Sequence, residues 1–327
     1  MVSTDDTKAQ FAASRSNTAG TSTGVELMDS TEMKAIADDN KAEADEEIIL
    51  KIPALTPIYW CEKMTATTFG ETFADWFTQT LGFGYTYTSI VIFAFFFVTL
   101  GVQLKVTTYW PVIFWLVMAS SSVAGTCFSD FIDRTLQLGY PVGMSILLSI
   151  LLFIMGCWKM TGEHMSVEGA MTRKAEAFYW ATILVSNTLG TALGDFLADS
   201  LELGFAMTAG IIGGLLLVCA GLAYFTKLSH VVLFWIAFVL TRPFGATFGD
   251  LLTKGTEKGG LDLGTLPASM VIFALFVVYF AIEMYMRYKA RQVKEAKKVD
   301  SESEEGDVES SAPQPHHHIE TEGDFMP

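Results

Sequence analysis

Long apolar runs alternate with short polar segments along the chain between residues 57 and 286, and every second segment is a turn that contains glycine. A helix needs about 20 predominantly apolar residues to cross the hydrocarbon core of a bilayer. The pattern predicts an all-α integral membrane protein with eight transmembrane helices. They are expected at Pro57–Leu81, Thr86–Leu104, Pro111–Leu136, Val142–Trp158, Ala177–Leu201, Ala206–Phe225, Val231–Leu252 and Ala268–Met286.

A nine-residue motif recurs near the end of every second predicted helix. It reads "FGETFADWF" at Phe69–Phe77, then "AGTCFSDFI" at Ala124–Ile132, "LGTALGDFL" at Leu189–Leu197 and "FGATFGDLL" at Phe244–Leu252. Each copy has a glycine, three variable residues, a small residue and an aspartate, followed by a short turn and another apolar run. Recurrence at a fixed pattern indicates duplication. We therefore expect four αα-hairpin repeats, at about 57–104, 111–158, 177–225 and 231–286.

The two halves of this membrane domain, residues 53–286, also match at an offset of 120 residues. Tyr59-Trp60 corresponds to Tyr179-Trp180, and Phe114-Trp115 corresponds to Phe234-Trp235. The match predicts two parallel halves. The first helix contains Glu62, Lys63, Glu71 and Asp75, so hydropathy alone supports it poorly. Its equivalent, Ala177–Leu201, is expected to be apolar, and a helix as polar as the first spans a bilayer only when neighbouring helices surround it.

Two faces of each motif helix carry different chemistry, because residues four apart share a face. One face is a stripe of small residues, which in a membrane allows helices to pack closely. The glycines of this stripe are Gly70, Gly125, Gly190, Gly194, Gly245 and Gly249. The adjacent face is acidic and predicts a central site that binds a cation or a proton. Its acids are Glu71, Asp75, Asp130, Asp195 and Asp250.

Arg242 is the candidate partner for these acids. It lies in a layer whose other members are Thr67, Ser122 and Asn187, and we expect it to neutralise Asp75 or Asp195 if it has only a structural role. Pro243 follows it and is expected to kink or interrupt the helix, since proline removes a backbone donor. The alternative for the aspartates is a structural role, in which they cap the hairpin ends at the membrane interface. Lys63 is expected to extend toward the interface.

Composition places most of the charge outside the apolar region. The net charge is −15, and 51% of the residues are hydrophobic. Residues 1–52 and 287–327 are rich in acids and poor in aromatics, which predicts disordered tails. The acidity argues against nucleic acid as a partner and leaves the lipid bilayer and a small cation or solute. Basic residues in the loops on the side of the tails place both termini in the cytoplasm by the positive-inside rule.

Other candidate chemistry is weak. Cys61, Cys127, Cys157 and Cys219 lie in apolar segments and are expected to be free thiols. Glu163, His164 and Glu168 share one loop, and His316–His318 form a short tract, so a metal site is left open. No cofactor motif is present in the sequence, and the motifs HExxH and GxSxG are missing, which argues against an enzyme.

The stretches "ATTFGETFADWF", "KAEAFYWATILVSNTLGTALGDFLAD" and "GATFGDLL" resemble an uncharacterised family of bacterial multi-span membrane-anchored proteins. The resemblance covers about Ile58–Arg287 and rests on the repeated GETxAD and GTxxGD motifs. It implies a membrane topology and a repeat, and no activity.

The favoured hypothesis is a secondary transporter or exchanger for a cation or a proton-coupled solute, with the acids and Arg242 along its pathway. The alternative is a non-transporting membrane scaffold whose tails bind partners. An intramembrane enzyme ranks third, because four equivalent aspartates fit a symmetric site better than a catalytic pair. The substrate, the direction of transport, the coupling ion and the oligomeric state are left open.

Overall fold

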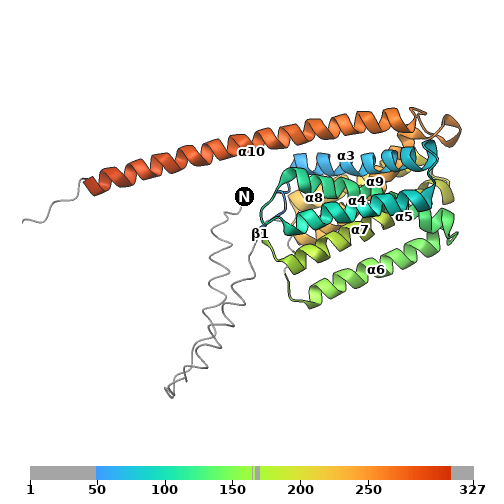
Figure 1. Ribbon diagram of the computed structural model, residues 1–327, viewed down its shortest axis with the longest axis horizontal. Coiled ribbons are helices and arrows are strands. Elements are labelled where there is room, and N and C mark those ends of the chain that lie inside the picture. The colour runs from blue at the N-terminus through green and yellow to red at the C-terminus, as the bar shows by residue number, and fades with distance from the viewer. Residues whose placement is uncertain (1–48, 164, 166–169, 311–327) are drawn as a thin grey trace, which may run out of the picture. The chain divides into compact units, whose positions relative to one another are not determined.

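The computed structural model describes residues 49–163, 165 and 170–310, and this part of the chain is almost entirely helical. Its long helices are α3 (Pro57–Asp75), α4 (Tyr85–Lys105), α5 (Pro111–Asp130), α6 (Tyr140–Met160), α7 (Arg173–Asp195), α8 (Phe205–Phe225), α9 (His230–Thr253) and α10 (Thr265–Ser310) (Figure 1). Strands β1 (Ile49–Leu50) and β2 (Ala170–Met171) pair antiparallel ahead of α3 and α7. The fold class predicted from the sequence is confirmed. Residues 1–48 and the tract His316–His318 lie outside the described residues.

The helix boundaries follow local chemistry that recurs from repeat to repeat. Thr56 caps α3 by accepting a hydrogen bond from the backbone N–H of Tyr59, and Pro57 occupies the first helical turn. Each outer helix is preceded by a glycine with φ between 72° and 78°, a left-handed conformation that favours glycine. These glycines are Gly84, Gly139, Gly204 and Gly264.

The ends of the motif helices differ between repeats. Five-residue π-helical segments, Trp76–Thr80, Phe131–Thr135 and Phe196–Ser200, follow α3, α5 and α7. In the fourth repeat α9 instead continues to Thr253, and a 3₁₀ turn at Thr256–Lys258 leads into α10. The last connection is therefore built differently from the other three.

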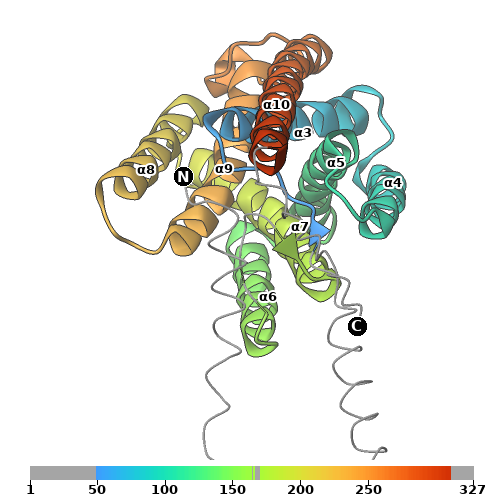
Figure 2. The same ribbon diagram turned by 90° about the vertical axis from the view of Figure 1, so that its left-hand side faces the viewer.

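The four motif helices form a closed inner ring. Around it α3 packs against α5, α5 against α7, α7 against α9, and α9 against α3. The outer helices α4, α6, α8 and α10 surround this ring (Figure 2). All four motif helices run in the same direction, so their motif aspartates lie at one end. We call it the motif end, and the opposite end, where α3 begins, the terminal end.

Each outer helix packs against the motif helix of the next repeat. Helix α4 lies against α5, α6 against α7, and α8 against α9, while α10 closes the circle by packing against α3. The repeats are hairpins in chain order, but their main packing partners belong to neighbouring repeats. This exchange links all four repeats into one core.

The outer helices present large apolar side chains outward. Examples are Val98, 67% exposed on α4, Phe153, 72% exposed on α6, and Leu217, 76% exposed on α8. Six helices, α4, α5, α6, α8, α9 and α10, are long and apolar enough to cross a membrane. Such an apolar exterior cannot face water on this scale. The chain is a multi-pass membrane protein.

The remaining two long helices, α3 and α7, are too polar to meet the same measure. The expectation that Ala177–Leu201 would be apolar is therefore wrong. Helix α7 carries Glu176, Asn187 and Asp195 on buried faces, as α3 carries its own acids. Both helices belong to the inner ring, where packing against other helices replaces contact with lipid.

Helix α10 continues well beyond the predicted boundary at Met286 and ends at Ser310. Residues 287–300 contain several alanine, lysine, arginine, glutamine and glutamate residues, which are strong helix formers. A high-propensity segment extends an existing helix readily, because no new nucleus is needed.

Candidate functional site

The inner faces of the four motif helices form five layers of equivalent residues, spaced four positions apart. Every residue in these layers is at most 4% exposed. From the terminal end to the motif end the layers are Tyr59, Phe114, Tyr179 and Phe234; Lys63, Met118, Ile183 and Phe238; Thr67, Ser122, Asn187 and Arg242; Glu71, Thr126, Thr191 and Ala246; and Asp75, Asp130, Asp195 and Asp250. The layers change from aromatic to acidic along the axis of the ring.

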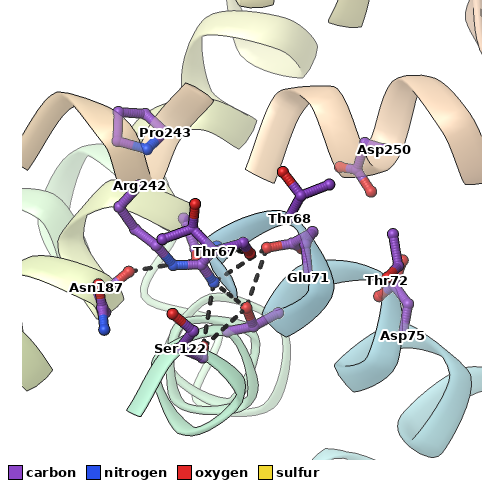
Figure 3. A network of polar contacts seen from close by, with 12 residues as sticks. Thr67, Thr68, Glu71, Thr72, Asp75, Ser122, Asn187, Arg242, Pro243 and Asp250 are labelled. Carbon is purple, nitrogen blue, oxygen red and sulfur yellow. Dashed lines mark hydrogen bonds and ion pairs between the residues drawn. The ribbon is translucent and has the colours of Figure 1, made fainter. Parts of the chain in front are cut away.

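The third and fourth layers are joined by one buried cation. Arg242 on α9 reaches across the ring to α3 and α5 (Figure 3). Its Nη2 lies 3.2 Å from Oε2 of Glu71, and its Nη1 donates to the backbone oxygen of Thr67 at 3.1 Å. The same Nη2 donates to the backbone oxygen of Ser122 at 3.3 Å and to the hydroxyl of Thr126. Arg242 is 0% exposed, so this ion pair is shielded from water.

One expectation for this region is wrong, and a second is wrong in part. Arg242 was expected to neutralise Asp75 or Asp195, but its carboxylate partner is Glu71. Pro243 was expected to kink or interrupt its helix, and the interruption is wrong, because α9 is continuous from His230 to Thr253 with Pro243 inside it. Gly190 on α7 faces this position: a Cβ added there would lie 2.9 Å from Cδ of Pro243.

The aspartate layer has its own cations, which come from the residues just beyond the motif. Lys254 contacts two helices at once, with its Nζ 2.6 Å from Oδ2 of Asp75 and 3.2 Å from Oδ1 of Asp250. Burial lowers the pKa of Lys254, but the carboxylates of Asp250 and Asp75 outweigh burial and raise the pKa above its ordinary value. In the second repeat, Nε of Arg134 lies 2.8 Å from Oδ1 of Asp130.

Asp195 is the member of this layer that lacks such a partner. It is 4% exposed, and it forms no hydrogen bond or ion pair with any residue in the described part of the chain. The cause is visible in the sequence. The residue four positions after the motif aspartate is Gln79, Arg134 and Lys254 in three repeats, and each contacts its own aspartate. The third repeat has Asp199 there, which is acidic and exposed.

The glycine stripe lies where neighbouring motif helices touch. A Cβ added to Gly70 would lie 2.5 Å from Cβ of Ser122, and one added to Gly125 would lie 2.8 Å from Cβ of Asn187. A Cβ added to Gly190 would lie 2.6 Å from Arg242, and one added to Gly245 would lie 2.5 Å from Thr67. At Gly194 the nearest atom would be 3.1 Å away on Thr247, and at Gly249 it would be 2.9 Å away on Glu71. The first glycine of each motif faces the third layer of the next helix around the ring. Larger residues would push the ring apart.

Sequence analysis assigned no site to Glu62 and the wrong environment to Lys63, two buried ionisable side chains on α3. Lys63 was expected to extend to the interface, but it is 0% exposed. Its Nζ lies 3.3 Å from Sδ of Met118 and 4.0 Å from the ring centre of Phe238. Glu62 is also 0% exposed. The useful signal was the repeat itself, because the residues equivalent to Lys63 in the other three repeats are apolar.

Metal and thiol chemistry find little support in the described part of the chain. There, no group of three or more histidine, cysteine or acidic side chains is placed to hold a metal ion. His164 and Glu168 lie outside the described residues. The cysteines at positions 61, 127, 157 and 219 are free thiols, as the sequence predicted.

Comparison with known families recovers the same four units. A family model described as Repeat of Unknown Function (DUF347) matches residues 58–109, 113–163, 178–229 and 233–288. Neither a curated protein nor a solved structure matches the chain. The boundaries agree with the repeats read from the sequence, and the expected likeness to a family without an established activity is confirmed.

Proposed function

Because the chain belongs to the DUF347 repeat family, and its repeats bring five acids together inside a membrane protein, we propose that it is a secondary transporter or exchanger. The transported or coupled species is a small cation, or a solute that moves together with a proton. Asp195 is the residue at which the cation or proton binds.

The charge balance of the site supports this role. Its acids are Glu71 and the four motif aspartates, and the cations that pair with them are Arg134, Arg242 and Lys254. Five carboxylates against three cations leave two negative charges uncompensated when all groups are ionised. A charge inside a membrane costs several kcal/mol, so a site of this kind gains from a bound cation or proton.

The third repeat indicates where that charge is taken up. Asp195 has no ion-pair partner among the described residues, and its electrostatic neighbours include Asp250, Glu71 and Asp130. In the described part of the chain, Arg134 is the only cation among the main electrostatic neighbours of Asp195, and it is already bound to Asp130. An unpaired acid beside other acids attracts a cation more strongly than an acid that already has a partner. The unpaired carboxylate of Asp195 therefore favours a cation-binding or proton-binding role for this layer.

The test compares Asp195→Asn with Asp199→Arg in proteoliposomes. Asp195→Asn keeps the shape of the side chain and removes its charge. Asp199→Arg leaves Asp195 intact but places an arginine four residues after it, as Arg134 lies four residues after Asp130 in the second repeat. We expect both variants to fold and both to lose most of the cation or proton flux seen with the parent protein.

Asp199→Asn is the matched control, since it removes the exposed acid without supplying a cation, and it should retain flux. Unchanged flux in folded Asp195→Asn and Asp199→Arg would refute the role of Asp195. No flux from the parent protein across a panel of cations, with and without a pH gradient, would favour the scaffold alternative.

A further inference from the structure

Glu62 is a buried acid far from the aspartate layer, at the terminal end of α3. It is 0% exposed, and neither carboxylate oxygen has a hydrogen-bond partner among the residues that the structure describes. The equivalent residues in the other repeats are Val117, Thr182 and Ala237. The fold therefore accepts uncharged side chains at the three equivalent positions, and the repeat itself does not call for an acid.

Across the contact between α3 and α10, Glu62 interacts electrostatically with a second acid, Glu283, whose hydrogen-bonding capacity is largely occupied. Oε1 of Glu283 accepts from Nε of Arg287 at 2.7 Å and from the hydroxyl of Tyr109 at 3.3 Å. Oε2 of Glu283 accepts from Nε1 of Trp115 at 3.1 Å. Arg287 is thus committed to Glu283.

The groups that act electrostatically on Glu62 come from several elements. They are Glu283 and Arg287 from α10, Tyr109 from the connection ahead of α5, and Tyr59 from α3 itself. Helix α9, which also packs against α3, contributes no titratable side chain to this set among the described residues. The guanidinium of Arg287 therefore acts on two carboxylates, through a hydrogen bond to Glu283 and through space on Glu62.

An ionised Glu62 would be a buried charge without a donor, at a cost of several kcal/mol. Two species can remove that cost, a proton or a metal cation. Hard metal cations take about six oxygen ligands, or keep several waters. This place offers mainly the two oxygens of Glu62, because those of Glu283 already accept from three donors. A proton needs only one oxygen.

We propose that Glu62 and Glu283 form a proton-binding site at the contact between α3 and α10, separate from the aspartate layer. A proton from water forms an O–H bond on one carboxylate oxygen of Glu62, and the neutral acid then donates to Glu283. Loss of the proton returns the charge to Glu62 beside Glu283. Arg287, with 33% of its side chain exposed, marks the edge through which the proton reaches water. The site does not depend on cation binding at Asp195.

Infrared pH-difference spectra of the purified full chain test this assignment through the C=O band of a protonated carboxyl group. We expect the parent protein to show such a band at neutral pH and Glu62→Gln to lose one component of it. Glu176→Gln is the matched control, because Glu176 is also buried, at 2% exposed, but pairs with Lys51 at 2.6 Å. It should keep that component, and so should Asp195→Asn. A folded Glu62→Gln variant with an unchanged band would overturn the proposal.

Two further variants keep the proposal testable if Glu62→Gln does not fold. Glu283→Gln removes a neighbouring negative charge, so the band should titrate at lower pH. Arg287→Gln removes a positive charge, so the band should titrate at higher pH. Each change should alter proton affinity ~10-fold or more, since charges at contact distance have effects of that order. Identical midpoints in both variants and the parent protein would also overturn the proposal.

Discussion

At the scale of single residues, the four repeats separate side chains that recur in every copy from side chains that occur in one copy. The motif glycines and aspartates recur in all four copies, so their places in the ring were predictable from spacing alone. The sequence identified Arg242 as a partner of the acids but assigned it to Asp75 or Asp195 instead of Glu71, and it did not predict that Lys254 pairs with Asp75. Lys254 lies outside the motif, and it reaches Asp75 only because α9 neighbours α3 in the closed ring.

Removing the charge of Arg242 should destabilise the protein, because Glu71 would then be buried without a counter-ion. For a pair of this kind the loss is about 3–5 kcal/mol. We expect Arg242→Gln to lower the folded yield and the melting temperature measured by size-exclusion chromatography after heating. The double variant with Glu71→Gln should recover most of the loss. A double variant as unstable as Arg242→Gln would show that the arginine acts through its contacts with Thr67, Ser122 and Thr126 instead.

A methyl group on Gly245 should be costly, whereas one on Gly214 should not. A Cβ at Gly245 would lie 2.9 Å from a backbone carbon of Thr67, and nothing lies within 4 Å of a Cβ at Gly214. Overpacking of this type costs about 1–3 kcal/mol. Alanine in an open helical position gains up to about 1 kcal/mol over glycine. Thermal unfolding of Gly245→Ala and Gly214→Ala should therefore shift in opposite directions, and equal shifts would contradict the close approach of α9 and α3.

At the scale of helices, the sequence predicted the number and order of the elements but not their partners. Short glycine turns indicated hairpins, and hairpins suggest helices that pack against each other within a repeat. In the structure α4 packs against α5 instead, and α10 packs against α3. The apolar pattern of an outer helix shows that one face is buried, but it carries no information about which motif helix covers that face. The π-helical segments after three motifs left no signal in the hydropathy pattern either.

Engineered disulfides can test this exchange of partners. Thr72 on α3 and Ser269 on α10 have hydroxyl oxygens 3.0 Å apart, and those of Thr99 on α4 and Ser120 on α5 are 3.2 Å apart. Cysteines at side chains this close can meet the geometry of a disulfide with little backbone movement. We expect both pairs to oxidise in a background without the four native cysteines.

The two pairs differ in what they hold together. After cleavage at a protease site inserted at Gly162, the Thr72→Cys/Ser269→Cys bond should keep both halves of the chain together on a non-reducing gel. The Thr99→Cys/Ser120→Cys bond lies within one half, so its fragments should separate. Fragments of the first pair that separate despite oxidising conditions would contradict the closure of the ring by α10.

At the scale of the whole molecule, hydropathy and the packing of the helices support different numbers of membrane crossings. Hydropathy supports six spanning helices and leaves out α3 and α7. The ring supports eight, because α3 and α7 occupy places equivalent to α5 and α9 and contact the same kinds of neighbours. Hydropathy measures each helix as if lipid surrounded it. Hydropathy therefore underestimates how readily α3 and α7 can cross the membrane, because protein covers the polar faces of both helices.

Cysteine labelling at Leu138, Glu202 and Leu228 separates the two topologies. All three side chains are exposed, and they lie in the α5–α6, α7–α8 and α8–α9 connections. If all eight helices cross, Leu138→Cys and Glu202→Cys react with an impermeant maleimide from one side, and Leu228→Cys reacts from the other. If α3 and α7 do not cross, Leu138→Cys and Leu228→Cys share a side and Glu202→Cys is opposite. We expect the first pattern, with Leu228→Cys on the cytoplasmic side, because Lys105, Lys159 and Lys227 flank the connections at that end. The second pattern would leave α7 outside the bilayer and would rule out the membrane-embedded site at Asp195.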